Sequence, residues 1–427
     1  MGMTMTEKIL ARAAGVQRLK PGDVATVNIE TTVAMDSTFQ PGRLKEERWD
    51  AVLSVHDPNK ITIIFDHLVP ANDENTATAH RLGRQFAKKF GIERLHDVGP
   101  DQGIAHSIVA ENGYALPGTV LVGSDSHTSG GGAFNCAAIP VGRPDLVYAV
   151  VTGETWFHVN ETIRYDFTGK LRPGVSAKDV FLTIAGKWGA HVNQNVEYGG
   201  PGIFTLSINA RRTLAIMGTE LSGDFNILEP DDLMLNYVRE RNPGAKFYPT
   251  PPDEDAVYKD RRSVDLSKIE PLVALPDAVL KNSVPIREVA GSPIDQAFIG
   301  SCANGSLDDL AVAAKVVKGR KVAKSTRLII TPGTQGTYLA ALKAGYIETL
   351  MDAGAVVTPA TCGACFGGHL GVLAPDEVCI TASTRNFKGR MGAPSARIYM
   401  ASPATVAASA LAGKIASAAE FFEGDLE

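Results

Sequence analysis

The sequence predicts an α/β protein, and three observations lead to this fold class. Short apolar runs rich in β-branched residues, such as residues 61–65 and 119–123, alternate with longer segments of helical periodicity. Both runs lead directly into polar residues, and open α/β sheets place their ligand sites at such strand ends. The chain has 427 residues, too many for one ordinary domain, so we expect two or three domains.

The elements of the first part of the chain follow from its local patterns. We expect helices over residues 6–15, 74–90, 146–155, 176–188 and 209–221. We expect strands over residues 24–29, 60–65, 95–98, 119–123 and 162–167, the last of them exposed. We expect an irregular or weakly helical segment over residues 44–55, a tight loop over 197–202, and an exposed excursion rich in Pro, Asp and Glu over 242–260.

The second part of the chain returns to strand–helix alternation after a less regular stretch. Residues 272–285 are expected to form a linker, which puts the main domain boundary near residue 285. Beyond it we expect strands over residues 296–299 and 327–331 and helices over residues 307–317 and 336–344. The sequence therefore divides into residues 1–285 and residues 286–427.

Composition excludes several classes of function. The net charge is −5 with no basic patch, so nucleic acid is not an expected partner. No stretch is long and apolar enough to span a membrane, and residues 1–8 lack a signal pattern. Five cysteines are too few and too uneven for a disulfide framework, which fits a reducing cytoplasm. Two of them, Cys136 and Cys379, are expected to be small buried apolar residues.

The other three cysteines are candidates for holding an iron–sulfur cluster. Cys362 and Cys365 lie three residues apart in a Gly-rich stretch, and Cys302 lies upstream in another segment of small residues. Soft thiolates select soft metals and Fe–S clusters, and three thiolates on a four-iron cluster leave one iron open to an oxygen ligand. The same pair spacing also occurs in buried structural cysteines and in half of a zinc site.

Two arginines follow the close thiol pair. Arg385 and Arg390 are five residues apart on a Gly-containing segment. A guanidinium binds a carboxylate as a two-pronged fork, so these residues suit a ligand that carries carboxylates. The alternative is ordinary surface charge.

Polar residues at predicted strand ends are candidates for acid–base chemistry. They are Asp66, His67, His106, Asp125, His127 and Glu220. A carboxylate on one ring nitrogen fixes the tautomer of a histidine and raises its basicity, which makes Asp–His pairs more informative than single histidines. Each residue could also be hydrogen-bonded scaffolding. Dehydration of a hydroxy di- or tricarboxylic acid would use all of these groups, because it needs a Lewis acid, a base and carboxylate binders.

Gly130, Gly131 and Gly132 follow the second of these clusters. Three consecutive glycines could let backbone N–H groups face an anion. They do not match a phosphate loop, which would end in Gly-Lys-Ser or Gly-Lys-Thr.

Taken together, these motifs carry a family resemblance. The matching stretches are residues 65–67, 103–106, 123–128, 300–305, 361–365 and 385–390. In this order they resemble the aconitase superfamily, and within it the large subunits of 3-isopropylmalate dehydratases and their homoaconitase-like relatives. The resemblance covers nearly the whole chain.

The resemblance implies a three-domain α/β/α arrangement, with domains 1 and 2 in residues 1–285 and domain 3 in residues 286–427. It implies a [4Fe-4S] cluster on Cys302, Cys362 and Cys365, acid–base roles for the six residues above, and substrate binding by Arg385, Arg390 and Ser126. The family's swivelling fourth domain is not expected in this chain. We therefore expect a small swivelling-domain subunit as a partner and a small hydroxy-carboxylic acid as substrate.

Three residues depart from the family pattern and leave the substrate open. Met35, Ile216 and Thr384 stand where relatives usually carry hydrogen-bonding side chains. An unpaired polar group in a buried site is costly, so these changes should alter how substrate oxygens are held. The implied enzyme is a hydro-lyase or isomerase acting on 3-isopropylmalate, or alternatively a homoaconitase or a 2,3-dimethylmalate-type dehydratase. Outside this class, the alternatives are a non-catalytic RNA-binding relative and a zinc-structured scaffold.

Overall fold

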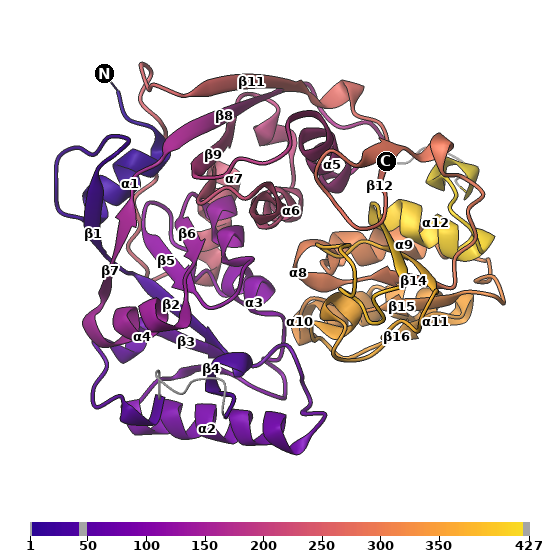
Figure 1. Ribbon diagram of the computed structural model, residues 1–427, viewed down its shortest axis with the longest axis horizontal. Coiled ribbons are helices and arrows are strands. Elements are labelled where there is room, and N and C mark those ends of the chain that lie inside the picture. The colour runs from indigo at the N-terminus through magenta and orange to yellow at the C-terminus, as the bar shows by residue number, and fades with distance from the viewer. Residues whose placement is uncertain (1, 42–48, 422–427) are drawn as a thin grey trace.

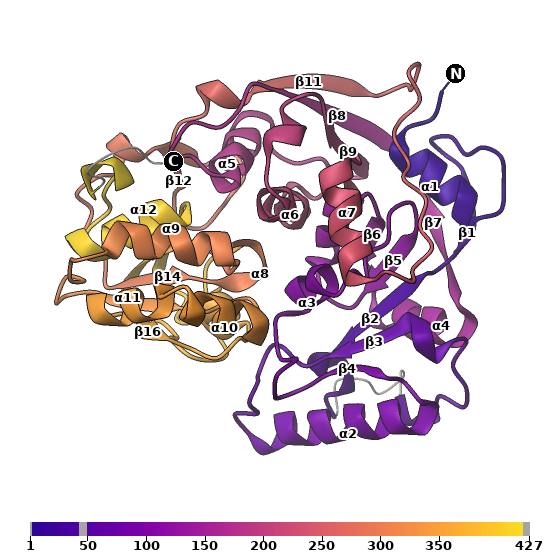
Figure 2. The ribbon, with the colours of Figure 1, turned by 180° about the vertical axis from the view of Figure 1, so that it is seen from behind.

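The computed structural model describes residues 2–41 and 49–421, and three main β-sheets organise this part of the chain (Figure 1). The first lies in the N-terminal part, the second in the middle of the chain, and the third in the C-terminal part. The view from behind shows the same separation, with the C-terminal sheet and its helices on one side of the molecule (Figure 2). This arrangement confirms the predicted α/β class.

The first sheet is five-stranded and entirely parallel. Its order is β4 (Arg94–His96), β3 (Ile61–Ile64), β2 (Thr31–Met35), β5 (Val120–Gly123) and β6 (Ala137–Pro140). The central strands are buried along their whole length, which explains their continuous apolar runs. Their carboxyl ends lead into Asp36, Asp66 and the Asp125 loop.

Four helices and a small antiparallel pair of strands surround this sheet. They are α1 (Met5–Ala13), α2 (Glu74–Phe90), α3 (Ala105–Glu111) and α4 (Arg143–Thr152), with β1 (Val24–Asn28) paired to β7 (Glu154–His158). The helix α2 has the predicted bounds because Asp73 caps its first turn and Gly91 ends it in the left-handed conformation. The helix α4 begins and ends earlier than predicted, since Gly153 terminates it and the next residues enter β7.

The second sheet is four-stranded, parallel and lies in the middle of the chain. Its order is β10 (Asn226–Leu228), β9 (Gln194–Gly199), β8 (Glu161–Thr168) and β11 (Asp260–Asp265). Its helices are α5 (Ala177–Trp188), α6 (Ile208–Met217) and α7 (Asp232–Arg241). The capping box of Ser176 confirms the predicted start of α5. The prediction that residues 162–167 are an exposed strand was wrong, because β9 and β11 flank β8 and most of its side chains are buried.

The third sheet is seven-stranded and mixed. Its order is β13 (Ser283–Pro285), β12 (Leu272–Ala274), β18 (Arg397–Met400), β17 (Val378–Thr381), β14 (Gln296–Ile299), β15 (Arg327–Ile330) and β16 (Val356–Val357). Its helices are α8 (Ser301–Asn304), α9 (Leu307–Val317), α10 (Gln335–Lys343), α11 (Tyr346–Ala353) and α12 (Pro403–Ala412). Five strands, from β18 to β16, run parallel to one another.

The expected linker over residues 272–285 is instead part of this sheet. It contributes β12 and β13, which pair antiparallel, and β12 also pairs with β18. Short, Pro-containing edge strands resemble loops in sequence, because the sheet that holds them is built from distant residues. The division at residue 285 stays a prediction. Of the segment 44–55, residues 44–48 lie outside the described residues, and Trp49–Ala51 form one 3₁₀ turn.

The three glycines after the second polar cluster meet protein rather than ligand. Gly130–Gly132 lie in a buried 3₁₀ helix, Thr128–Phe134. A Cβ added to Gly132 would lie 1.8 Å from the carbonyl oxygen of Asn226 in β10, and one added to Gly130 would lie 2.6 Å from Ile216 in α6. Close packing of the first sheet against the second, and not anion binding, accounts for these glycines.

Across residues 2–41 and 49–421, no helix combines the length and the apolar character needed to cross a membrane.

Candidate functional site

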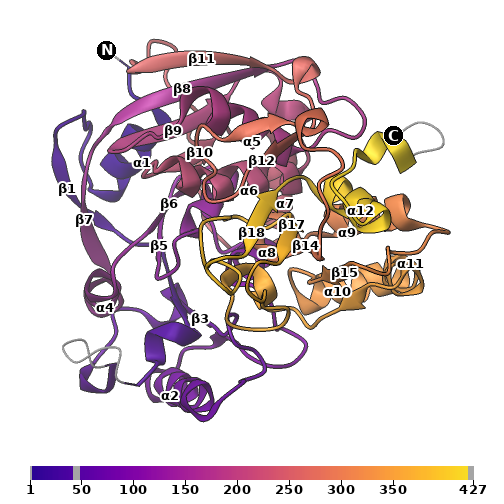
Figure 3. The ribbon, with the colours of Figure 1, turned by 45° about the vertical axis from the view of Figure 1, so that its right-hand side comes forward.

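The carboxyl ends of the first and third sheets lead to a common pocket. Figure 3 shows the third sheet, with β14, β15, β17 and β18, beside the N-terminal part of the chain. Nine of the predicted site residues line it, namely Asp66, His67, His106, Asp125, His127, Cys302, Cys362, Cys365 and Arg390. Ile104, Ser301, Phe366 and Thr384 complete the lining. The thiols follow β14 and β16, so the third sheet obeys the same strand-end rule as the first.

His67 is held by two carboxylates at the end of the first sheet. Its Nδ1 lies 2.7 Å from Asp66 Oδ1 and 3.6 Å from Asp36 Oδ1. Burial alone would lower the pKa of His67, but the charges of Asp66 and Asp36 outweigh it and raise this pKa well above the usual value. The other oxygen of Asp66 accepts the backbone N–H of Ala105, at the start of α3, at 2.8 Å. The imidazolium is therefore the favoured form of His67.

Asp125 connects the other two histidines. Its Oδ1 lies 2.6 Å from His106 Nε2 and accepts the backbone N–H of His127 at 2.8 Å. Burial would raise the pKa of Asp125, yet its contacts with His106 and His127 lower this pKa well below the usual range. His127 has a raised pKa because Asp125 and Glu220 offset the effect of its burial. Asp125 is therefore a carboxylate that bridges two rings facing one pocket.

Three predicted residues adjoin this lining without being part of it: Ser126, Glu220 and Arg385. Glu220 Oε1 lies 3.0 Å from His127 Nε2 and accepts Arg385 Nε at 2.7 Å. Ser126 Oγ lies 3.4 Å from His127 Nδ1. Ser126 and Glu220 therefore contact His127 directly, and Arg385 contacts it through Glu220.

The three thiols differ in their surroundings. Arg390 Nη2 donates to Cys365 Sγ at 3.7 Å, and this charge outweighs burial and lowers the pKa of Cys365. Cys302 and Cys362 have no hydrogen-bond partner for their sulfurs within the described ranges, and burial raises the pKa of each thiol well above its usual value. No cysteine of the described chain forms a disulfide.

These residues fit an iron–sulfur cluster. Two partly buried sulfurs without hydrogen-bond partners become thiolates only beside positive charge, which metal ions supply. Arg390 Nε is also buried without a hydrogen-bond partner, beside the thiol that the same guanidinium contacts. Three sulfurs and an unsatisfied guanidinium nitrogen around one pocket suit an anionic, sulfide-containing group.

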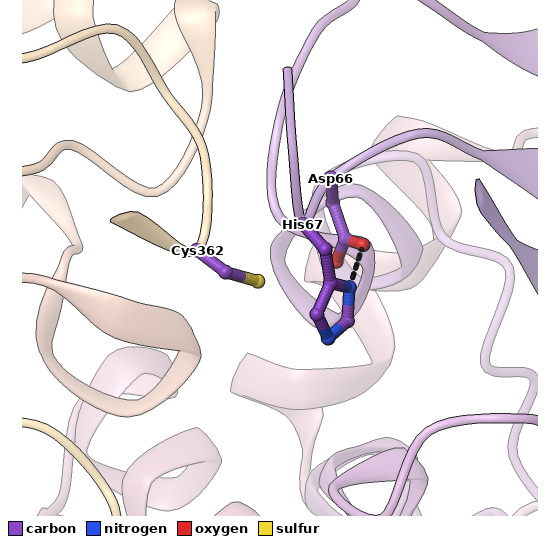
Figure 4. Close-up of side chains that lie close together, drawn as sticks. All are labelled: Asp66, His67 and Cys362. Carbon is purple, nitrogen blue, oxygen red and sulfur yellow. Dashed lines mark hydrogen bonds and ion pairs between the residues drawn. The ribbon is translucent and has the colours of Figure 1, made fainter. Parts of the chain in front are cut away.

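The loop that carries the thiol pair is anchored to the first sheet. The backbone N–H of Cys362 donates to the carbonyl oxygen of Asp66 at 2.8 Å, and Thr361 Oγ1 donates to the same oxygen at 2.8 Å. The ligand atoms of Asp66, His67 and Cys362 lie within 4.8 Å of one another (Figure 4). Two segments far apart in sequence therefore meet directly at the pocket.

The local backbone also orients the third thiol. Ser301, one residue before Cys302, has a φ of 83°, a left-handed conformation that β-carbon sterics disfavour. Such strain costs about 1–3 kcal/mol and persists only where the surroundings impose it. The tight turn from β14 into α8 imposes it here and turns the side chain of Cys302 into the pocket.

The sequence did not identify Asp36 and Lys178 as site residues. Asp36 follows β2, a strand that the sequence analysis did not predict, and the contacts with His67 and His80 outweigh its burial and lower its pKa. Lys178 is fully buried in α5 and donates to the carbonyl oxygen of Ser383. An apolar run ending in Met35–Asp36 was the available signal for the first, and no sequence signal distinguishes Lys178 from a surface lysine.

The three departures from the family pattern occupy different places. Met35 and Ile216 are buried in the apolar core that joins the first two sheets and do not line the pocket. Thr384 lines it, with Oγ1 3.9 Å from Cys365 Sγ. Of the three, Thr384 is the one placed to contact a bound molecule.

Comparison with known proteins agrees with this geometry. A profile of the Aconitase family (aconitate hydratase) matches residues 7–293 and 278–413. The chain is 49% identical over 418 residues to the "3-isopropylmalate dehydratase large subunit" of Mycolicibacterium smegmatis, covering 98% of this chain and 97% of that protein. It is 41% identical over 421 residues to the "Probable methanogen homoaconitase large subunit" of Methanothermobacter thermautotrophicus, with 97% of each chain covered.

A solved structure supports the fold. The holo-form of Thermococcus kodakaraensis aconitase X matches with a TM-score of 0.50 and 14% identity, over 87% of this chain and 88% of that one. The family profile and the full-length identities leave one assignment: this chain belongs to the aconitase family.

Proposed function

We propose that this chain is the large, catalytic subunit of a hydro-lyase of the 3-isopropylmalate dehydratase type. The observation that carries the proposal is one pocket lined both by three thiols and by histidines held on carboxylates. The names of the relatives at 41–49% identity support the same class, since they include 3-isopropylmalate dehydratase and homoaconitase large subunits. The reaction removes and re-adds water on a hydroxy di- or tricarboxylic acid.

We propose that Cys302, Cys362 and Cys365 hold a [4Fe-4S] cluster. When bound, such a cluster supplies a Lewis acid that polarises the departing hydroxyl group. Its three protein ligands come from loops after β14 and β16, both of which end at the pocket.

The other residues bind substrate and hold protons. Arg390 lines the pocket, and Arg385 is held by Glu220 beside it with 21% of its side chain exposed, so both suit carboxylates of the substrate. His67, favoured as the imidazolium, is placed to donate a proton to the leaving oxygen. Asp125 orients His106 and holds the backbone of His127, which lowers the entropic cost of reaching the reactive geometry.

The proposal includes a partner and a location. The large-subunit names of the relatives support a small subunit that completes the site, as expected from the family resemblance. We propose a cytoplasmic location and no nucleic-acid partner, because the cysteines are few and the net charge is −5.

Kinetics of the reconstituted complex test the function. The chain is purified anaerobically with a small swivelling-domain subunit and assayed with 3-isopropylmalate, homocitrate, citrate and 2,3-dimethylmalate. High turnover on 3-isopropylmalate with poor rates on the others supports the main proposal, and a preference for homocitrate or 2,3-dimethylmalate supports the alternative substrates. No turnover on any of them would contradict the proposal.

Metal analysis separates the remaining classes. Iron and acid-labile sulfide with an absorbance band that bleaches on iron loss support the cluster. Zinc without iron and sulfide would instead favour a zinc site, for which Asp66, His67 and Cys362 are the grouped ligands. A salt-dependent gel shift of the apo-protein would favour an RNA-binding relative.

A further inference from the structure

The chain buries one lysine completely, and neither the fold nor the proposed reaction explains it. Lys178, in the first turn of α5, has no exposed surface and is the one lysine among the buried residues of the described chain. Its Nζ donates to the carbonyl oxygen of Ser383 at 2.9 Å and lies 3.3 Å from Met217 Sδ. Within residues 2–41 and 49–421, no carboxylate oxygen lies at ion-pair distance from it. A buried ammonium with two neutral partners is costly unless negative charge lies nearby.

Two of the groups whose charge acts on Lys178 line the pocket. The groups whose charge favours its ammonium form are, in order of size, Cys302, Asp309, Cys365 and Glu220. Burial lowers the pKa of Lys178 to about 8, which still leaves it mostly charged at neutral pH. Two of these four groups, Cys302 and Cys365, are proposed cluster ligands, so their thiolate charge would favour the ammonium form of Lys178.

The two contacts of Lys178 lie on the segments that carry a proposed carboxylate binder and its partner. Ser383 directly precedes Thr384, whose hydroxyl lies 3.9 Å from Cys365 Sγ, and Arg385 follows. Met217 is the last residue of α6, and Glu220 follows in the next turn. Arg385 and Glu220 hydrogen-bond to each other, and the one ammonium group contacts both the backbone of Ser383 before Arg385 and the side chain of Met217 before Glu220.

We propose that Lys178 is a positioning residue that provides a counter-charge for the thiolates of Cys302 and Cys365 and holds residues 383–385 near Glu220. This inference rests on the proposed function, because it concerns the cluster that the thiols would hold. A fixed cation stabilises an anionic group in a site that excludes water, and it also favours the more negative, reduced form of that group. The hydrogen bond to Ser383 adds an orienting role that a distant charge could not supply.

Two variants separate the charge from the hydrogen bond. Lys178→Met removes both, whereas Lys178→Gln removes the charge and keeps an N–H donor for the carbonyl oxygen of Ser383. Lys187→Met is the matched control, since Lys187 lies on the same helix with an exposed side chain over the Trp188 ring. The folded state of each apo-protein is checked by near-UV circular dichroism and thermal unfolding.

The readouts are iron retention and reduction potential, measured on the anaerobically reconstituted chain. The iron affinity of both Lys178 variants, read as the chelator concentration that removes half of the iron, should fall about 10–100-fold, as for other residues that support metal ligands. Their reduction potential should become more negative. Lys178→Met alone should also raise KM in the reconstituted complex. Lys187→Met should match the wild type in all three readouts.

Two results would overturn the inference and leave the proposed function intact. The first is a wild-type protein that holds iron and sulfide, beside folded Lys178 variants with unchanged affinity and potential. The second is failure of both variants to give folded apo-protein, which would make Lys178 a structural residue only. A wild-type protein without iron and sulfide would overturn both proposals, so the wild-type measurement tells the two failures apart.

Discussion

The two sheets that form the pocket prepare their side chains in opposite ways. At the end of the first sheet, His67 and His106 both lie against carboxylates, and the carboxylates in turn accept backbone N–H groups. At the end of the third sheet, the sulfurs of Cys302 and Cys362 have no hydrogen-bond partner within the described residues. The histidines and carboxylates of the first half have partners within this chain, whereas two sulfurs of the second half are left without a hydrogen-bond partner and are available to a bound group.

This difference separates two kinds of preorganisation. The acid–base half is held by hydrogen bonds and ion pairs, so its geometry should survive loss of the cofactor. The thiol half is held by backbone geometry, through the strained Ser301 and the anchoring of Cys362 to Asp66. Substitutions in the two halves should therefore affect different measurements, and the predictions below exploit this separation.

The largest expected effect is loss of a thiol. In Cys362→Ala, iron and sulfide should be lost and turnover should fall by roughly 10³-fold or more, because a metal Lewis acid contributes several kcal/mol to the barrier. Unfolding of the apo-protein should change little, since the sulfur has no partner in the described chain. Cys379→Ala, a buried cysteine outside the pocket, is the control and should keep its iron. Retention of the cluster in Cys362→Ala would remove this residue from the ligand set.

The next effect concerns the acid–base half. Asp125→Asn should lower kcat by about 10²–10⁴-fold, the range typical of general acid–base groups, because His106 loses its charged partner. The iron content should stay at the wild-type level, since Asp125 is not among the proposed ligands and no hydrogen bond joins it to a thiol in the described chain. Asp97→Asn serves as the control, because Asp97 pairs with Arg84 away from the pocket. Loss of iron in Asp125→Asn would show that the two halves are not independent.

A smaller effect is expected for carboxylate binding. Arg385→Lys should raise KM about 10–100-fold, as expected for loss of a forked, charge-assisted hydrogen bond, with a smaller change in kcat. Arg327→Lys alters an arginine of the third sheet that pairs with Glu377 at the surface, and its KM should be unchanged. An equal fall in kcat with constant KM would instead assign Arg385 to the chemical step.

The stability of the apo-protein should depend on pH through His67. The pKa of His67 is raised in the folded state, so the stability that its charge contributes is complete below its unfolded pKa of about 6.5 and is lost as pH rises through the folded value. Urea unfolding should show a larger difference between wild type and His67→Asn at about pH 6 than at about pH 10. A difference that grows with pH would contradict the assignment of His67 as an imidazolium.

The smallest expected effect concerns substrate choice. Thr384→Asn should change the ratio of kcat/KM between 3-isopropylmalate and homocitrate by about two- to tenfold, the equivalent of one neutral hydrogen bond. Ile216→Val is the matched control, because Ile216 belongs to the buried core and does not line the pocket. If both variants change the ratio equally, core packing rather than contact with the substrate sets the preference.

Local patterns predicted many of the elements and failed where pairing decides the structure. Helices with their own caps, such as α2 and α5, have the predicted extents because their end signals lie within the helix and its flanks. The strands β2, β6 and β12 escaped prediction, because short buried or edge strands acquire their identity from neighbours far along the chain. For the same reason, β8 proved buried and residues 272–285 proved to be sheet.

The site divides in the same way. Strand-end motifs and the thiol spacing indicated Asp66, Asp125, Cys362 and their neighbours. Residues of this kind can be recognised from sequence because each belongs to a short motif of neighbouring residues. The motifs could not show that Ser126, Glu220 and Arg385 fall outside the pocket lining, or that Asp36 Oδ1 lies 3.6 Å from His67 Nδ1. These positions depend on the directions in which side chains point where loops from different parts of the chain come into contact.

By itself, the sequence determined the α/β class, the set of chemical groups and the family, because these follow from composition, local periodicity and short motifs. The tertiary structure alone decided how the groups are distributed: paired carboxylates and histidines after one sheet, two thiols without hydrogen-bond partners after the other, and a buried Lys178 bonded to Ser383. The physical reason is that charge pairing and burial depend on contacts between residues that are far apart in the sequence. Local sequence patterns do not indicate such contacts.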